Sequence, residues 1–209
     1  MGYPPRLCFD GAIYHVTARG DNREPIFLDD NDYQQYLLLL CCYKDQFHFI
    51  LHAYALMPNH IHLVLAPAAG TTISHLMQCL AIRYTKYFNH RHQRVGHVFQ
   101  GRFHSRLIDQ ERYLLVASRY VHRNPCKARL CLRPQDYAWS SYTAYLDRAA
   151  DQICLVDPEM VLALMRGEER ERQVENYRDF VETPDREEET WEPILSRPRG
   201  RPLKLKNGI

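Results

Sequence analysis

The stretch Leu56-Met57-Pro58-Asn59-His60-Ile61-His62-Leu63-Val64-Leu65 decides the fold of this 209-residue chain. The run from His60 to Leu65 is rich in branched apolar residues, which predicts a buried strand. Alternate side chains of a strand point to the same face, so His60 and His62 project side by side while Ile61 enters a core. Two neutral imidazoles on one rigid face supply half of a divalent-metal site. Histidines at this spacing also occur as a plain polar face, so the pattern alone leaves both interpretations open.

The composition is that of an ordinary globular protein, with 45% hydrophobic and 25% charged residues. The length allows one good-sized domain with appendages. No run of about 18 apolar residues is present, so we expect no membrane span. Residues 1–6 lack the basic-then-apolar layout of a signal peptide. The seven cysteines form no Cys-x-x-Cys pair, which predicts a reduced, cytoplasmic protein without a zinc knuckle.

Charge is strongly segregated along the chain, although the net charge is +2. Residues 83–133 contain 12 Lys and Arg against two acidic residues, whereas residues 157–192 contain 13 Asp and Glu against five Arg. Residues 193–209 carry five basic residues and no acidic one. A charge run is usually a solvated surface, but blocks of opposite sign this large favour a polyanion-binding core beside an acidic segment.

Apolar periodicity predicts the element order β-α-β-β-α-β. This is the order of a split βαβ, ferredoxin-like α+β fold with a central antiparallel sheet, and we expect its helices to lie on one face. The predicted strands are residues 12–18, 47–56, 60–66 and 103–108. The predicted helices are residues 33–46, residues 73–89, and residues 110–122 or just beyond.

Three parts of the chain follow from this organisation. Residues 1–150 are expected to form the main domain, with a short helix beginning near residue 139. Residues 151–182 are expected to form a helical extension, in which 157–180 is charged and helical. Residues 183–209, acidic and then basic, are expected to be a flexible tail.

A second set of polar residues lies on the helix after the fourth predicted strand. Tyr120 and Asn124 are four residues apart and therefore face the same side of that helix. Metal-assisted phosphoryl transfer needs a nucleophile, which Tyr120 could be, and a Lewis acid, which Asn124 could help the two histidines to bind. Mixed nitrogen and oxygen ligands suit Mg²⁺ or Mn²⁺ better than structural zinc. The alternatives are a packing tyrosine and an asparagine placed at a helix end by Pro125.

Several motifs of the chain resemble, in order, the signatures of the REP-associated tyrosine transposases, which belong to the larger group of single-tyrosine HUH transposases. The resemblance extends over roughly residues 6–146, and a set of motifs in order is far more specific than any one of them. The motifs are Tyr14-His15-Val16, Arg19-Gly20-Asp21, Pro25-Ile26-Phe27, Leu56 to Val64, Gly96-His97-Val98-Phe99-Gln100-Gly101-Arg102-Phe103, Arg119-Tyr120-Val121-His122-Arg123-Asn124-Pro125 and Trp139-Ser140-Ser141-Tyr142.

The resemblance implies a metal-dependent endonuclease that cleaves and rejoins single-stranded DNA. By matching positions, His60, His62 and Asn124 would hold Mg²⁺ or Mn²⁺, and Tyr120 would form a 5′-phosphotyrosine intermediate. The substrates implied are short palindromic repeats that fold as hairpins. A cytoplasmic, nucleoid-associated protein that acts as a monomer or homodimer is the corresponding expectation.

Basic residues of the positive block are predicted to hold the DNA backbone, with interleaved aromatic residues available to stack on unpaired bases. The tail contains Arg-Gly-Arg-Pro, which resembles the core of an AT-hook, although a generic basic tail is an equal alternative. The predicted DNA-binding residues are Arg83, Lys86, Arg91, Arg94, Arg102, Arg106, Arg199 and Arg201.

Two rival functions remain open at this point. One is a domesticated, non-catalytic protein that binds DNA hairpins, which would not need the histidine pair or Tyr120. The other is a metal hydrolase that uses water as the nucleophile and in which Tyr120 is structural.

Overall fold

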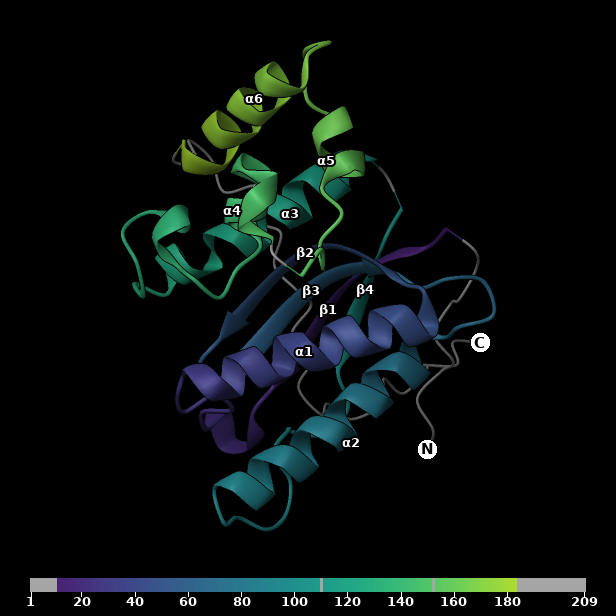
Figure 1. Ribbon diagram of the computed structural model, residues 1–209, viewed down its shortest axis with the longest axis vertical. Helices are drawn as coiled ribbons and strands as arrows, with labels where there is room; N and C mark the ends of the chain where they lie inside the picture. The colour runs from purple at the N-terminus through teal and green to yellow at the C-terminus, as the bar shows by residue number, and fades with distance from the viewer. Residues whose placement is uncertain (1–10, 110, 152, 184–209) are drawn as a thin grey trace, which may run out of the picture.

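The computed structural model describes residues 11–109, 111–151 and 153–183. At its centre is a four-stranded antiparallel sheet with the order β2-β3-β1-β4 (Figure 1). This order confirms the ferredoxin-like α+β fold predicted from the sequence. The strands are β1 (Ile13–Arg19), β2 (Ile50–Met57), β3 (His60–Ala66) and β4 (His104–Ile108).

Helices connect and cover the strands in the predicted order, and further short helices follow. None of the helices that the structure describes combines the length and the apolar character needed to cross a membrane. The helices are α1 (Asp30–Phe47), α2 (Ile73–Arg91), α3 (Glu111–Lys127), α4 (Tyr142–Leu146), α5 (Glu159–Ala163) and α6 (Arg170–Glu182), with 3-10 turns η1 (Asp21–Arg23), η2 (Pro134–Asp136) and η3 (Arg148–Ala150).

The first two helices begin at polar N-cap residues. The Asp29 side chain accepts from the N–H of Asn31 at 3.0 Å, and the Thr72 side chain accepts from the N–H of His75 at 3.2 Å. Helix α1 runs to Phe47 and ends where His48 adopts a left-handed conformation, with φ 52°. Strand β2 therefore starts at residue 50, three residues later than the sequence predicts.

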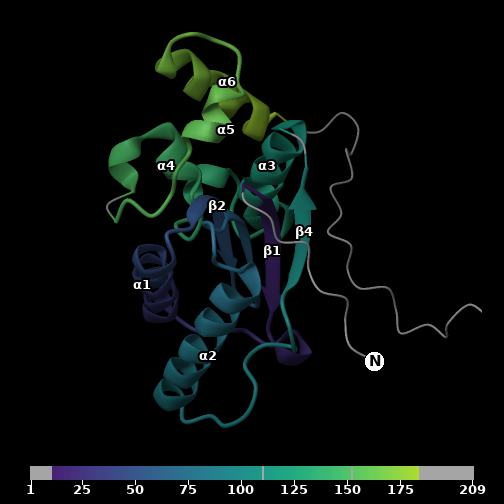
Figure 2. The ribbon, with the colours of Figure 1, turned by 90° about the vertical axis from the view of Figure 1, so that its right-hand side faces the viewer.

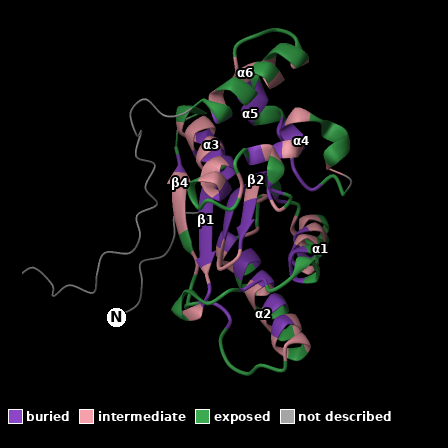
Figure 3. Cartoon of the chain, turned by 90° about the vertical axis from the view of Figure 1, so that its left-hand side faces the viewer, coloured by how far each residue is buried: buried purple, intermediate pink, exposed green. Residues whose placement is uncertain are grey.

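Helices cover both faces of the sheet, and the prediction of helices on one face is wrong. Helices α1 and α2 lie on one face, while α3 packs against β2 and β3 on the other (Figure 2). Strand β3 is buried at every position after His60, as expected for a strand that is covered on both sides. Its neighbour β1 is buried along most of its length as well (Figure 3). Ile61 is fully buried, on the face of α1 and α2, which confirms its predicted place in the core.

Helix α3 continues through Pro125 to Lys127, whereas the sequence predicts an end at residue 122 or just beyond, with Pro125 near it. The proline costs one helical hydrogen bond, but the next turn is held by two others. The N–H of Ala128 donates to Asn124 O, and that of Leu130 donates to Pro125 O, both at 2.9 Å.

The charged stretch 157–180 does not form one continuous helix. It is divided into α5 and α6 by a loop in which Gly167 has φ +119°.

Helix α3 is held from behind by the C-terminal helices. On its outer side, the fully buried His122 contacts Ser141 Oγ at 2.8 Å and the Tyr177 hydroxyl at 2.8 Å. Burial lowers the pKa of His122 to about 3, so the ring is neutral and offers one donor and one acceptor to these two hydroxyls. Tyr145 stacks on Tyr177 with ring centroids 4.6 Å apart. The helix is thus enclosed between the sheet and α4–α6 (Figure 1).

The C-terminal end of α2 is joined to the N-terminal end of α1 by a buried carboxylate. Asp32 is fully buried and accepts from the N–H of Leu28 at 2.8 Å and from Arg91 at 2.7 Å. It also lies 3.0 Å from His92 Nε2. Burial by itself raises the pKa of Asp32, but the hydrogen bonds from Leu28, His92 and Arg91 outweigh it, and the pKa lies below its usual value.

We expect Asp32→Asn to reduce the free energy of unfolding at pH 7 by about 2–4 kcal/mol, because it removes the buried negative charge that accepts from Leu28 and Arg91. A lowered carboxyl pKa stabilises the fold above the unfolded pKa of about 4, and this contribution is lost as the pH falls through the folded value. The difference between the wild type and the variant should therefore shrink below about pH 4. Urea denaturation measures this, with the exposed neighbour Asp30→Asn as the control. Equal losses for both variants would contradict the role given to Asp32.

Candidate active site

The two histidines of β3 face α3 and lie next to each other. The ring centroids of His60 and His62 are 4.9 Å apart, with the ring planes at 80°. His62 is buried, whereas His60 is half-buried and lies at the end of the strand. The tight turn at Pro58 and Asn59 joins β2 to β3 and fixes where this pair begins.

A hydrogen bond engages the Nδ1 atom of each imidazole. His60 Nδ1 lies 2.6 Å from Asn59 Oδ1, and the amide of Asn59 is oriented by its Nδ2, which donates to Arg23 O at 3.1 Å. His62 Nδ1 lies 3.0 Å from His15 Nε2 and 3.4 Å from Thr17 Oγ1. In both rings the nitrogen left for a metal ion is therefore Nε2.

Both rings are neutral near pH 7, which is the form that binds metal ions. Burial, followed by the charge of Arg19, lowers the pKa of His60 to about 4. Burial, followed by the charges of His15, His60 and Arg19, places the pKa of His62 well below its usual value. His15 is also buried, and burial together with the charge of Arg106 lowers its pKa to about 4.

Tyr120 lies on the side of α3 that faces these rings. Its ring centroid is 5.6 Å from that of His62 and 5.8 Å from that of His15, both in edge-to-face arrangements. Lys127, two turns further along the helix, holds its Nζ 5.5 Å from the Tyr120 ring centroid. The structure thus brings the predicted nucleophile and the predicted metal-binding histidines together from distant parts of the chain.

Asn124 lies one turn after Tyr120 on the same helix. Its Nδ2 donates to Tyr120 O at 3.4 Å, and no hydrogen bond joins it to either imidazole. Among the described residues, no group of three His, Cys, Asp or Glu side chains is arranged to hold a metal ion. A third protein ligand beside His60 and His62 would therefore be of another kind, and the amide oxygen of Asn124 is chemically suited to Mg²⁺ or Mn²⁺.

Two arginines that face the imidazoles add positive charge to the site. Arg19 is opposite His60 in the pairing of β1 with β3, and Arg106 is opposite His15 in the pairing of β1 with β4. Opposite residues of paired strands project from the same face. Arg106 is among the predicted DNA-binding residues. Arg19 and His15 are not, because only the strand register places them beside the histidines.

The other predicted DNA-binding residues lie elsewhere. Arg83 and Lys86 are exposed on α2, which covers the opposite face of the sheet. Arg91 is paired with Asp29 and Asp32, as described for the α1–α2 junction, and the exposed Arg94 is paired with Glu24 at 2.7 Å. Arg199 and Arg201, together with the predicted AT-hook-like segment, lie outside the residues that the structure describes.

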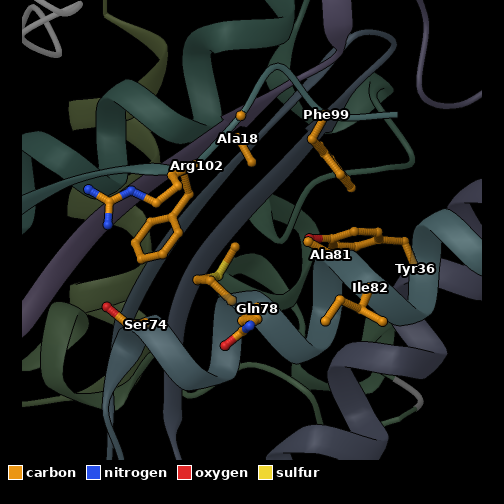
Figure 4. Close-up of a pocket in the computed structure, with 11 residues that line it drawn as sticks. Ala18, Tyr36, Ser74, Gln78, Ala81, Ile82, Phe99 and Arg102 are labelled. Atoms are coloured by element: carbon orange, nitrogen blue, oxygen red, sulfur yellow. The ribbon is translucent and has the colours of Figure 1, made fainter. Parts of the chain in front are cut away.

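A cavity of about 460 Å³ lies between α2 and the segment leading into β4 (Figure 4). Its lining includes Ala18, Tyr36, Phe99 and the exposed Arg102. Ala18 alternates with Arg19 along β1 and therefore points to the face of α1 and α2. The cavity is thus on the opposite side of the sheet from Tyr120.

Comparisons with known proteins show the family of the chain and structures that are similar to it. The family model described as "Transposase IS200 like" matches residues 8–124. A structure of a REP-associated tyrosine transposase bound to a REP hairpin is similar to this chain, with a TM-score of 0.61 and 21% identity over 73% of this chain and 90% of that one. A crystal structure of a candidate transposase from Deinococcus radiodurans R1 gives a TM-score of 0.40 and 18% identity over 56% of this chain and 92% of that one. The comparison with curated proteins gave no match.

The hydrogen bonding of Tyr120 and Tyr177 predicts that loss of the hydroxyl destabilises the fold only at Tyr177. The Tyr120 hydroxyl makes no hydrogen bond with the part of the chain that the structure describes, so Tyr120→Phe should leave the free energy of unfolding within about 0.5 kcal/mol of the wild type. Tyr177→Phe should reduce it by about 1–3 kcal/mol, since His122 Nδ1 would lose its buried partner. Chemical denaturation of the two variants makes the comparison. A large loss for Tyr120→Phe would indicate a structural role for that hydroxyl.

Proposed function

The chain belongs to the family of IS200-like transposases, and from this premise we propose that it cleaves and rejoins single-stranded DNA with Tyr120 as the nucleophile. The observation that carries the proposal is the meeting of the Tyr120 ring with the neutral His62 ring, at 5.6 Å between centroids. A purely structural tyrosine in this position would not require two uncharged imidazoles with Nε2 atoms left for a ligand. The order of motifs from Tyr14 to Tyr142 favours the REP-associated subgroup within the family.

The proposed chemistry starts with the positioning of a phosphate between α3 and the sheet. His60, His62 and Asn124 would bind a divalent cation such as Mg²⁺ or Mn²⁺, which supplies Lewis-acid polarisation of a non-bridging phosphate oxygen. Arg19 and Arg106 place positive charge on the same face, which favours the approach of the DNA backbone.

Cleavage then exchanges one phosphate ester for another. The Tyr120 oxygen attacks phosphorus, the bond from phosphorus to the 3′ oxygen breaks, and the proton lost by the phenol is balanced by the one gained at the 3′ hydroxyl. The product is a 5′-phosphotyrosyl link. Since this link conserves the phosphodiester energy, a 3′ hydroxyl of another strand can reverse the step and rejoin DNA without a nucleotide cofactor.

The proposed substrate is a hairpin formed by a palindromic repeat in single-stranded DNA. The similar structure of a REP-associated tyrosine transposase holds a REP hairpin, and this chain covers 90% of that protein. The positive block of residues 83–133 supplies charge for such a polyanion. Because α2 carries part of this charge on the far side of the sheet from Tyr120, a bound hairpin would contact the cleavage site and α2 together only by passing around an edge of the sheet.

We expect Tyr120→Phe to form no detectable covalent adduct with a labelled single-stranded hairpin, because the variant lacks the attacking oxygen. Tyr113→Phe, which removes a hydroxyl from the same helix, is the matched control and should retain the adduct. Denaturing gel electrophoresis measures both. An adduct in Tyr120→Phe would refute the assignment. Free cleaved ends without an adduct in the wild type would indicate a hydrolase, and binding without cleavage would indicate a non-catalytic hairpin-binding protein.

We expect His60→Ala and His62→Ala to lose Mg²⁺- or Mn²⁺-dependent cleavage while keeping hairpin affinity within about threefold, since the imidazoles face the metal site and not the DNA backbone. His75→Ala, an exposed histidine on α2, should behave as the wild type. Cleavage gels with and without chelator, together with gel-shift titrations, separate the two effects. Full cleavage by both alanine variants would rule out the proposed metal site.

A further inference from the structure

His15 contacts both the proposed metal-binding histidine and the proposed nucleophile. It lies on β1, between β3 and β4 (Figure 1), and its side chain is 2% exposed. Its ring is nearly parallel to that of His62, with an interplanar angle of 10° and centroids 5.2 Å apart. It also meets the Tyr120 ring edge to face at 5.8 Å. No other described residue makes ring contacts with both partners.

The hydrogen bond between the two rings determines whether His62 can bind a metal ion. A neutral imidazole carries one N–H and one lone pair, so one of the two rings must donate across the 3.0 Å contact of His15 Nε2 and His62 Nδ1. If His62 donates, its Nε2 keeps a lone pair for a cation. If His15 donates, the proton of His62 is on Nε2, and that nitrogen cannot be a ligand.

His60 makes a corresponding hydrogen bond, in which the partner can only be the acceptor. Asn59 offers an amide oxygen at 2.6 Å, so His60 Nδ1 must donate and Nε2 keeps its lone pair. The amide cannot be turned around without cost, because its nitrogen donates to Arg23 O. At His62 the corresponding acceptor is a ring nitrogen of His15, and Thr17 Oγ1 is a distant second contact at 3.4 Å.

We propose that His15 is a positioning residue that accepts the Nδ1–H of His62 and thereby fixes the tautomer and ring plane in which His62 Nε2 binds the cation. The proposal rests on the metal site put forward in the proposed function. The ring of His15 also packs edge to face against Tyr120, the proposed nucleophile. A displaced His15 would therefore also change the distance between His62 and Tyr120.

The tautomer of His62 can be measured directly in the wild-type protein without metal. Long-range ¹H–¹⁵N correlation spectra distinguish a protonated Nδ1 from a protonated Nε2. We expect His62 to carry its proton on Nδ1 in the wild type. A proton on His62 Nε2 would overturn the inference, whatever the activity of the protein, and this measurement needs no variant that must fold.

Variants at His15 separate hydrogen bonding from packing. His15→Gln retains an acceptor at about the position of Nε2, whereas His15→Leu fills the space without one. We expect His15→Leu to weaken Mn²⁺ binding, followed by electron paramagnetic resonance, by about 10–100-fold and to lose the Nδ1–H tautomer of His62. His15→Gln should remain within about threefold of the wild type, and so should Thr17→Val, which removes the weaker contact to the same nitrogen.

The outcomes distinguish this inference from the proposed function. If folded His15→Leu binds Mn²⁺ as tightly as the wild type, His15 is a packing residue and the inference fails, while the roles of Tyr120 and His60 are unaffected. If His60→Ala and His62→Ala bind Mn²⁺ like the wild type, the metal site itself fails. A loss in His15→Leu that His15→Gln does not restore would show that ring shape, and not the accepting nitrogen, is what His62 requires, which would also overturn the proposal.

Discussion

The pairing of β1 with β3 is the interaction on which the rest of the site depends. It places Thr17 opposite His62 and Arg19 opposite His60, and it brings His15 within hydrogen-bonding distance of His62. Because side chains alternate along a strand, a slip of one residue would turn all of these polar groups to the other face, into the apolar layer under α1 and α2. The apolar alternation of β1 and β3 therefore stabilises the register, and the register in turn determines the chemistry of the opposite face.

Local rules predicted those parts of the site that lie within one element. Alternation along β3 was enough to place His60 and His62 together with Ile61 in the core, and helical periodicity put Tyr120 and Asn124 on one side of α3. His15 and Arg19 could not be found in this way, since their proximity to the histidines comes from strand pairing between distant segments. The even spacing of His15 and Arg19, which places both on one face of β1, was the available signal, but it becomes meaningful only after the order β2-β3-β1-β4 is known.

The burial of β3 explains why helices cover both faces of the sheet and not one face, as the sequence predicted. A strand with six successive buried residues needs cover on both faces, and this requirement places α3 opposite α1 and α2. The helix boundary at Pro125 shows the opposite case, in which tertiary packing outweighs a local rule. The proline is buried, and the turn after it keeps its own hydrogen bonds, so the helix extends to Lys127, whose amine lies near the Tyr120 ring.

The position of Tyr120 depends as much on the outer side of α3 as on the sheet. His122 is two residues further along the helix and points away from the imidazoles, into a buried cluster with Ser141 and Tyr177. These partners lie outside residues 8–124, which the family model covers, so the segment that supports the helix of Tyr120 is not part of the matched region. On the same helix, Arg119 and Arg123 donate to the backbone oxygen of Thr183, just after α6, at 2.5 Å each. These two cations are therefore engaged in holding α6 against α3, and the positive charge that faces the histidines comes from the strands, through Arg19 and Arg106.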